Sequence, residues 1–392
     1  ARPAHRLSRS AGGQRQRALR RAAGDPTLGD PTTFPLVIED QVIYDDTAPW
    51  PTTADGTGVS LQRTRVDLWG SDADSWIDGT PTPGRFEPAK LAVLALDSNG
   101  IGEVGQVNNL THEAQSITLS QTYTNPVVFA GPASLIGSDP VVARVSDVQS
   151  DRFNLRLVEP SNLNGRHGVG EAVSYAVFEA GSHWLADGTH LEVGTVATSA
   201  TVGKRLTSTT WETVNFPHTF VTTPAVLSQP QSAAGQAYLV TRQNLITSTG
   251  FDVALEQEEQ ITRQHDTETV GYLAIDQGLG TWHGMKFEAE LTIPRFTGDG
   301  LFRRERFDQT FVAPPQVFAS LASYAGDDNA HLRFETVRDT DISLTVEEDT
   351  TQDGEITHAR EVAAYLAIGG SGPLTALATP ILDNQTQSFA ID

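Results

Sequence analysis

Cysteine is absent from the sequence, and Lys90, Lys204 and Lys286 are its only lysines. The absence of cysteine excludes disulfides, thiolate catalysis and zinc sites built from cysteine. The sequence also lacks any apolar run of about 18 residues, so no segment is predicted to span a membrane. A Gly-x-Ser-x-Gly elbow, a His-Glu-x-x-His motif and a phosphate-binding glycine loop are missing too. We therefore predict a protein that is not an enzyme.

Basic residues are scarce, since 27 lysines and arginines oppose 49 aspartates and glutamates, for a net charge of −22. Binding of nucleic acid needs a basic stripe, so this balance argues against a nucleic-acid partner. A strongly acidic surface keeps a protein soluble and can attract divalent cations. Adaptation to a salty medium is the plainer explanation of the composition.

Helical periodicity is also lacking, because no long stretch beyond the first 25 residues repeats its apolar residues every 3.6 positions. The chain has 392 residues, enough for two to four domains, and 38% of them are hydrophobic. Short alternating segments separated by Gly, Pro, Asn and Ser are typical of strands and turns. The predicted fold class is all-β, with tandem antiparallel β-sandwiches.

An arginine-rich arm is predicted over residues 1–33, where seven arginines and no acidic residue fall within the first 21 positions. Residues 14–23 could form a short helix. Such a run can contact nucleic acid or a membrane. On so acidic a chain, a flexible arm that docks on an acidic neighbour or stays solvated is favoured.

Residues 34–85 form the next predicted unit, which ends at a Pro-Thr-Pro-Gly boundary before a linker over 86–103. This unit resembles the C-terminal half of the lamin-tail domain of microbial exported proteins, which implies an immunoglobulin-like sandwich. The arginine-rich arm stands where the first strands of that family should be. The residues that carry the resemblance are 44–46, 48–51, 54–58, 60–61, 76 and 81–84.

Three repeats follow the linker, at 104–196, 197–291 and 292–377, with a tail over 378–392. Each repeat has a proline before a short apolar run, then an arginine 18 residues later, and a large apolar residue nine further on. A tyrosine comes near the end of each repeat, in a strand that is predicted to be buried. The four repeated positions are Pro126, Pro224 and Pro315; Arg144, Arg242 and Arg333; Phe153, Phe251 and Ile342; and Tyr175, Tyr272 and Tyr365.

The repeats resemble H-type lectins, on the Phe-and-Pro strands at 220–226 and 311–317, the arginine strand, the turn at 250–251 and the closing Tyr-Leu-Ala strand. The resemblance implies a small sandwich of six antiparallel strands and a site for galactosamine-type sugars on the arginine strand. H-type lectins commonly form trimers, so the three copies could build an internal pseudo-trimer. The tryptophan usual in the family's closing strand is tyrosine in all three copies.

The arginines are the first candidates for sugar binding, because a planar guanidinium can hold a pair of hydroxyls. Asp139 lies five residues before Arg144, and Asp328 lies five before Arg333, whereas Ala237 precedes Arg242. The alternative, which we favour, is a structural arginine that lies over its sheet and caps a loop.

Aromatic loops are the second candidates. Trp184, beside His183, and Trp282, beside His283, lie in matching loops. Either tryptophan could stack on a sugar or fill the core.

A histidine precedes a glutamate before each closing strand: His167 with Glu171, His265 with Glu268, and His358 with Glu361. Because the pair occurs three times, we favour a buried hydrogen bond that ties a loop down over metal binding or acid–base catalysis.

The acidic turn with Asp349, Asp353 and Glu355 is a candidate calcium site, and calcium is the only cofactor predicted, although such turns are most often solvated.

Two functions remain open. The first is a non-catalytic structural or adhesive protein that forms fibres or coats a cell or virion, with copies of itself as partners. The alternative is a multivalent lectin whose three weak sites gain avidity and whose partner is carbohydrate. Both imply an extracellular, cell-surface or virion-surface location.

Overall fold

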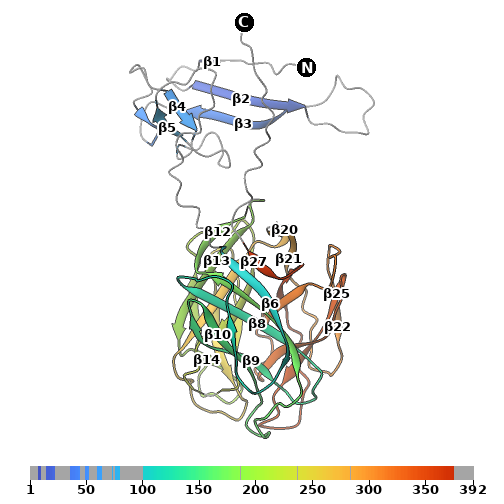
Figure 1. The fold of residues 1–392 in the computed structure, drawn as a ribbon. Coiled ribbons are helices and arrows are strands. Elements are labelled where there is room, and N and C mark those ends of the chain that lie inside the picture. The colour runs from blue at the N-terminus through green and yellow to red at the C-terminus, as the bar shows by residue number, and fades with distance from the viewer. Residues whose placement is uncertain are drawn as a thin grey trace. The chain divides into compact units, whose positions relative to one another are not determined.

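A computed structural model describes residues 100–374 except 186, 236 and 283, together with short segments within the first 79 residues. The chain divides into two compact units (Figure 1). One contains Ala1–Asp97 and Asp383–Asp392, and the other contains Ser98–Leu382. Residues 86–99 of the predicted linker, the tail over 378–392 and much of the lamin-tail-like motif lie outside the described residues. In the part that is described, no helix is long and apolar enough to cross a membrane.

The described part of the first unit is mostly strand. They are β1 (Ser8–Arg9), β2 (Arg15–Ala22), β3 (Leu36–Tyr44), β4 (Ser60–Arg63) and β5 (Trp76–Gly79). The strands β1, β2 and β3 form one sheet in that order, and β4 pairs with β5. The short helix predicted for residues 14–23 is therefore wrong. The arginine-rich segment pairs antiparallel with β3 instead, and this pairing satisfies backbone groups that an open sheet edge would leave unpaired.

The second unit contains three copies of a six-stranded arrangement, and the predicted all-β class is confirmed. Repeat 1 has β6 (Gly102–Leu110), β7 (Gln115–Thr118), β8 (Pro126–Ser134), β9 (Val142–Gln149), β10 (Arg152–Val158) and β11 (Glu171–Glu179). Repeat 2 has β13 (His190–Thr198), β15 (Glu212–Asn215), β16 (Ala225–Pro230), β17 (Leu239–Asn244), β18 (Gly250–Gln257) and β19 (Glu268–Ile275), with β14 (Thr201–Val202) added beside β18. Repeat 3 has β21 (Met285–Leu291), β22 (Arg303–Arg306), β23 (Gln316–Leu321), β24 (Ala330–Val337), β25 (Asp341–Glu348) and β26 (Ala363–Ile368).

Each repeat is a sandwich of two antiparallel sheets with the same strand order. The sixth strand lies between the first and third in what we call the inner sheet, as in β6-β11-β8. The fifth lies between the second and fourth in the outer sheet, as in β7-β10-β9. Repeats 2 and 3 reproduce both orders.

Strand pairing moves two predicted repeat boundaries. The strand β13 was expected within 104–196 and β21 within 197–291, but β13 pairs with β19 and β21 pairs with β26. Each is therefore the first strand of the following repeat. Alternation of apolar and polar residues along a segment indicates a strand. The sheet to which that strand belongs depends on a partner strand roughly 80 residues later.

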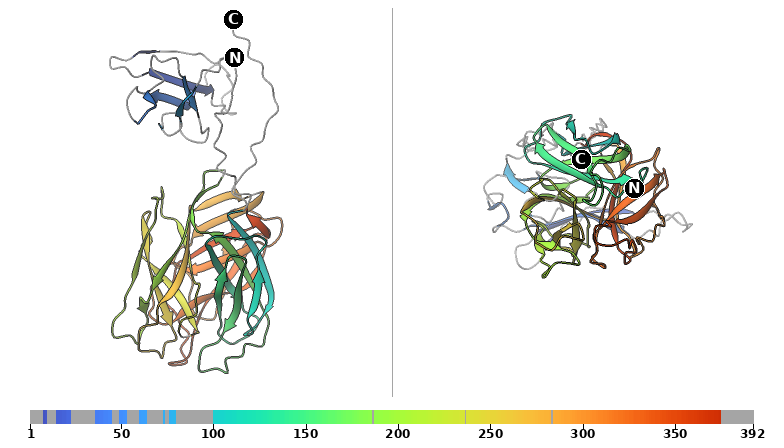
Figure 2. Two further views of the ribbon diagram at one scale, coloured as in Figure 1. Left: turned by 60° about the vertical axis from the view of Figure 1, so that its left-hand side comes forward. Right: turned by 90° about the horizontal axis from the view of Figure 1, so that it is seen from below.

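The three repeats close into a ring, as the view along their common axis in Figure 2 shows. Three short strands lie between or after the repeats: β12 (Gly181–Trp184), β20 (Gly278–Trp282) and β27 (Gly372–Leu374). Each extends the inner sheet of the next repeat, since β12 pairs with β13, β20 with β21, and β27 with β6. The last pairing returns to the first repeat, so the arrangement is the internal pseudo-trimer and not a line of domains.

Four apolar cores stabilise this unit. Three of them fill the individual sandwiches, and the fourth lies where the inner sheets of all three repeats meet. Inner strands are therefore buried on both faces, which explains why all six residues of β26 are buried and apolar. We refer to the fourth core as the shared core.

Candidate functional site

The repeated arginines do not face solvent. Their residues are 2% exposed at Arg144 and 0% exposed at Arg242 and Arg333. Each forms an ion pair with the glutamate at or just before the start of the closing strand of the next repeat, and we call these pairs the ring clamps. They join Arg144 to Glu268 (Nη2–Oε1 3.4 Å), Arg242 to Glu361 (Nη2–Oε1 2.5 Å) and Arg333 to Glu171 (Nη2–Oε1 3.2 Å).

The glutamate of each clamp is also fixed within its own repeat. Glu361 accepts hydrogen bonds from the Ser323 hydroxyl, from the backbone amide of Ala325 (2.9 Å) and from Nε2 of His358 (3.0 Å). In repeat 1, His167 Nε2 lies 3.2 Å from Glu171 Oε1. The favoured hypothesis for the histidine–glutamate pairs, a buried hydrogen bond that holds a loop, is confirmed in these two repeats.

Electrostatics in the repeat 3 clamp favour the charged forms. Burial opposes ionisation of Glu361, but its hydrogen bond from His358 and the charge of Arg242 lower its pKa to about 2. Burial likewise opposes protonation of His358, yet its bonds to Glu348 and Glu361 raise its pKa to about 9. The site is therefore a charged network at neutral pH.

A glycine lies against each of these histidines. A Cβ added to Gly326 would lie 2.7 Å from Cε1 of His358, and Gly137 and Gly235 have the same relation to His167 and His265. The close approach of ring and backbone explains why the loop carries glycine at this position in all three repeats.

The three clamps differ in their second carboxylate. Arg242 also pairs with Glu256 (Nη1–Oε2 3.0 Å), and Arg333 pairs with Glu347 (Nη1–Oε2 2.7 Å). Burial raises the pKa of Glu256 to about 7, with Arg242 partly offsetting it. Arg144 has no second carboxylate partner among the described residues, although, like the other two arginines, it donates to a serine carbonyl of the next repeat, that of Ser232 (2.9 Å). The first clamp is thus the weakest in charge complementarity.

The sugar site predicted on the arginines does not form. All three guanidinium groups are buried and paired with a glutamate of the next repeat, so none is exposed to hold a pair of sugar hydroxyls. Asp139 is exposed, and Asp328 pairs with Lys204 (2.7 Å) rather than with Arg333. Spacing along the chain placed these two aspartates near their arginines, but the arginine side chains point into the interface between repeats.

The two loop tryptophans have opposite surroundings. Trp282 is 1% exposed and belongs to the shared core, where its ring lies 5.4 Å from that of Phe178. Trp184 lies on β12 and is 51% exposed. Of the two, Trp184 alone is placed to stack on a ligand.

The acidic residues predicted to bind calcium do not converge. Asp349 is buried and accepts from the backbone amides of Thr351 (2.8 Å) and Glu259 (2.9 Å). Asp353 accepts from the amide of Glu355 (3.0 Å), whose own carboxylate accepts from a later amide of the same turn. These carboxylates therefore cap turns by accepting hydrogen bonds from backbone amides. The acidic composition of the segment does not by itself show that such amides lie nearby.

A different group of potential metal ligands is present, and the sequence did not predict it. His190, Glu192 and His218 bring one ligand atom each to within 4.8 Å of the others, the one such group among the described residues. The spacing of His190 and Glu192 on one strand places both side chains on the same face and is a signal that could have been found. His218 comes from a loop, and no sequence pattern connects it to them.

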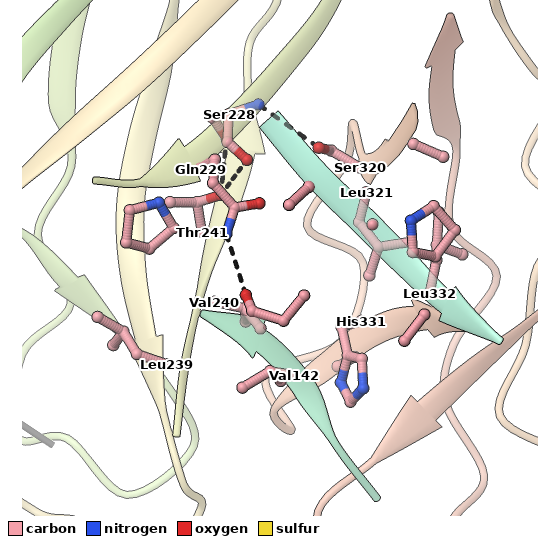
Figure 3. Close-up of a pocket in the computed structure, with 18 of the residues that line it drawn as sticks. Val142, Ser228, Gln229, Leu239, Val240, Thr241, Ser320, Leu321, His331 and Leu332 are labelled. Carbon is pink, nitrogen blue, oxygen red and sulfur yellow. Dashed lines mark hydrogen bonds between the residues drawn. The ribbon is translucent and has the colours of Figure 1, made fainter. Parts of the chain in front are cut away.

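Two of the cavities among the described residues lie between repeats. The third and fourth strands of all three repeats line a central cavity of ≈ 70 Å³, in which Gln229 Nε2 donates to the carbonyl of Ala143 at 3.1 Å (Figure 3). This volume is below the ~300 Å³ of small ligand pockets. A wider open groove of ≈ 680 Å³ lies between repeats 1 and 2, and Asp147, Gln149 and Gln231 are among its lining residues.

Comparison with known proteins gives one similarity among curated sequences. The chain is 27% identical over 292 residues to halomucin of Haloquadratum walsbyi. The match covers 72% of this chain and 3% of halomucin. No protein-family model and no solved structure matches the chain.

Proposed function

We propose that the chain is a non-catalytic structural or adhesive part of an extracellular protein, on the surface of a cell or a virion. The observation that carries this proposal is the closed set of ring clamps. The three arginines expected to bind sugar are instead buried between repeats, where they join three sandwiches into one body. A rigid module of this kind suits a role in assembly or display.

Two further observations support the proposal. The name of the similar protein, halomucin, indicates a mucin and favours an extracellular place for this chain. The net charge of −22 fits a protein that stays soluble in a salty medium.

Carbohydrate binding is the second candidate, and Trp184 favours it. An indole that is 51% exposed on an edge strand can stack on the face of a sugar ring. The open groove beside Asp147 offers hydroxyl and amide side chains but none of its lining residues is aromatic.

A glycan-array screen of the purified chain in concentrated salt separates the two candidates. The structural proposal predicts no defined sugar ligand from folded protein, and electron microscopy should then show ordered self-association. Binding that Trp184→Ala removes would establish a lectin with its site on β12. Binding that Asp147→Asn removes would place the site in the groove, and either result would overturn the structural proposal.

A further inference from the structure

The side chains of His190, Glu192 and His218 form a compact group, which we call the histidine cluster. Glu192 Oε1 lies 2.8 Å from Nε2 of His190 and 3.0 Å from Nδ1 of His218. All three ligand atoms lie within 4.8 Å of one another. Only modest side-chain movements would let one metal ion replace these hydrogen bonds with bonds of about 2.0–2.2 Å.

The cluster has a buried floor and an open side. Glu192 is 1% exposed and His190 is 7% exposed, whereas the side chain of His218 is 56% exposed. An ion held here would have three protein ligands and coordination positions open to water or to another molecule. This is the pattern of open zinc sites, not of closed structural ones.

The surrounding residues hold the ligands in place. The ring of His190 is stacked between Trp184 (centroids 4.5 Å apart) and Phe220 (4.4 Å). The hydroxyl of Ser182 donates to Glu192 Oε2 (2.6 Å), which orients the carboxylate and leaves Oε1 toward the imidazoles. Ligands oriented by such neighbours lose less freedom when a metal binds.

The other repeats show that the fold does not require these histidines. Glu103, Glu192 and Glu288 are equivalent, since each pairs across the inner sheet with the residue two after the repeated tyrosine. Glu103 accepts from Ser120, and Glu288 accepts from Tyr365. Neutral donors therefore satisfy the buried carboxylate elsewhere in the ring.

The histidines themselves are confined to repeat 2. The position of His190 is Ile101 in repeat 1 and Lys286 in repeat 3. His218 lies two residues before Phe220, an aromatic position that is Tyr123 in repeat 1 and Phe311 in repeat 3. The residues two before these aromatics are Gln121 and Gln309. Two imidazoles beside a carboxylate thus occur in one repeat of three, at positions where the fold accepts other residues.

We propose that the histidine cluster binds a divalent transition metal, with zinc as the ion that best suits it. Nε2 of His190, Nδ1 of His218 and Oε1 of Glu192 are the ligands. Imidazole favours zinc, copper or nickel over calcium, which takes oxygen ligands. The ion joins the β12–β13 hairpin to the loop after β15 and presents its open positions near the exposed Trp184. This site is independent of the structural function proposed above.

Zinc titration of the full chain in concentrated salt, by calorimetry and by competition with a chromophoric chelator, tests the site. The parent should bind one zinc ion and gain thermal stability from it. His218→Gln, which introduces the residue of the other two repeats, should weaken binding by at least about 10-fold. His183→Gln is the matched control, because His183 bonds to the Glu179 carbonyl outside the cluster, and it should bind like the parent.

A second variant, His190→Ile, guards against a folding defect in the first, because isoleucine occupies the equivalent position of repeat 1. Both variants should keep the unfolding temperature of the zinc-free parent to within a few degrees. Absence of zinc binding by the parent would overturn the proposal. Undiminished binding by the two folded variants, or equal loss in His183→Gln, would do the same.

Discussion

Replacement of Arg242 by methionine should destabilise the ring more than the same replacement of Arg144. Arg242 is fully buried between two carboxylates, those of Glu256 and Glu361, and its guanidinium lies 4.8 Å from the centre of the Tyr324 ring. Removal of one partner from a buried ion pair leaves an uncompensated charge and costs about 3–5 kcal/mol.

The expected cost at Arg144 is smaller. Its one carboxylate partner, Glu268, lies at 3.4 Å and keeps its hydrogen bond from the backbone amide of Ala234 when the arginine is lost. Both arginines also donate to a serine carbonyl of the next repeat, so that bond is lost from both variants and does not distinguish them. The carboxylate part of the loss at Arg144 is that of a single charged hydrogen bond, about 1.5–3 kcal/mol. The two variants should therefore differ by roughly 2 kcal/mol in the free energy of unfolding.

Urea unfolding followed by tryptophan fluorescence measures this difference, because Trp282 lies in the shared core and urea adds no salt. The difference should persist in concentrated salt, since buried pairs are screened little. The double variant Arg242→Met, Glu361→Gln should be less destabilised than the sum of its two single changes. A cost at Arg242 below about 1 kcal/mol, or a larger cost at Arg144, would refute the clamp as the link between repeats.

Four further variants test other parts of the structure. The pKa of His358 is raised to about 9, so its protonated ring contributes stability that is complete below about pH 6.5 and is lost as the pH rises through 9. The stability gap between the parent and His358→Gln should accordingly shrink from pH 6 to pH 9.5 in urea unfolding, and a gap that grows would contradict the charged network. Burial and the nearby Asp349 raise the pKa of Glu259 to about 8, so its ionisation costs stability between about pH 4.5 and 8. Glu259→Gln should unfold at a higher temperature than the parent at pH 8.5 and lose that advantage by pH 4.5; a constant advantage would assign the gain to packing. Trp282→Ala should lower the free energy of unfolding by about 3–5 kcal/mol because it leaves a cavity in the shared core. Trp184→Ala should lower it by less than about 1 kcal/mol, because that indole is exposed. Similar losses in the two variants would contradict the different burial of the two indoles.

Local patterns in the sequence determined the strands and their repetition. Alternation of apolar and polar residues, as in the strand that begins at Phe153, predicts a half-buried strand without knowledge of its partner. Repetition of one spacing in three copies revealed the three sandwiches. It also favoured a structural role for the histidine–glutamate pairs, because chemistry seldom needs the same group three times. These inferences depend on neighbours along the chain, which the sequence contains directly.

Only the tertiary structure decided which side chains meet. The sequence left Arg242 between a sugar ligand and a structural residue, and closure of the ring buried it against the next repeat. The sequence did not distinguish Trp184 from Trp282. In the structure Trp282 is buried in the shared core, whereas Trp184 is exposed on an edge strand. His218 joins Glu192 across 26 residues because a loop folds back onto β13. Contacts of this kind depend on how the three sandwiches pack around one axis. The local periodicity of the sequence contains no information about that packing.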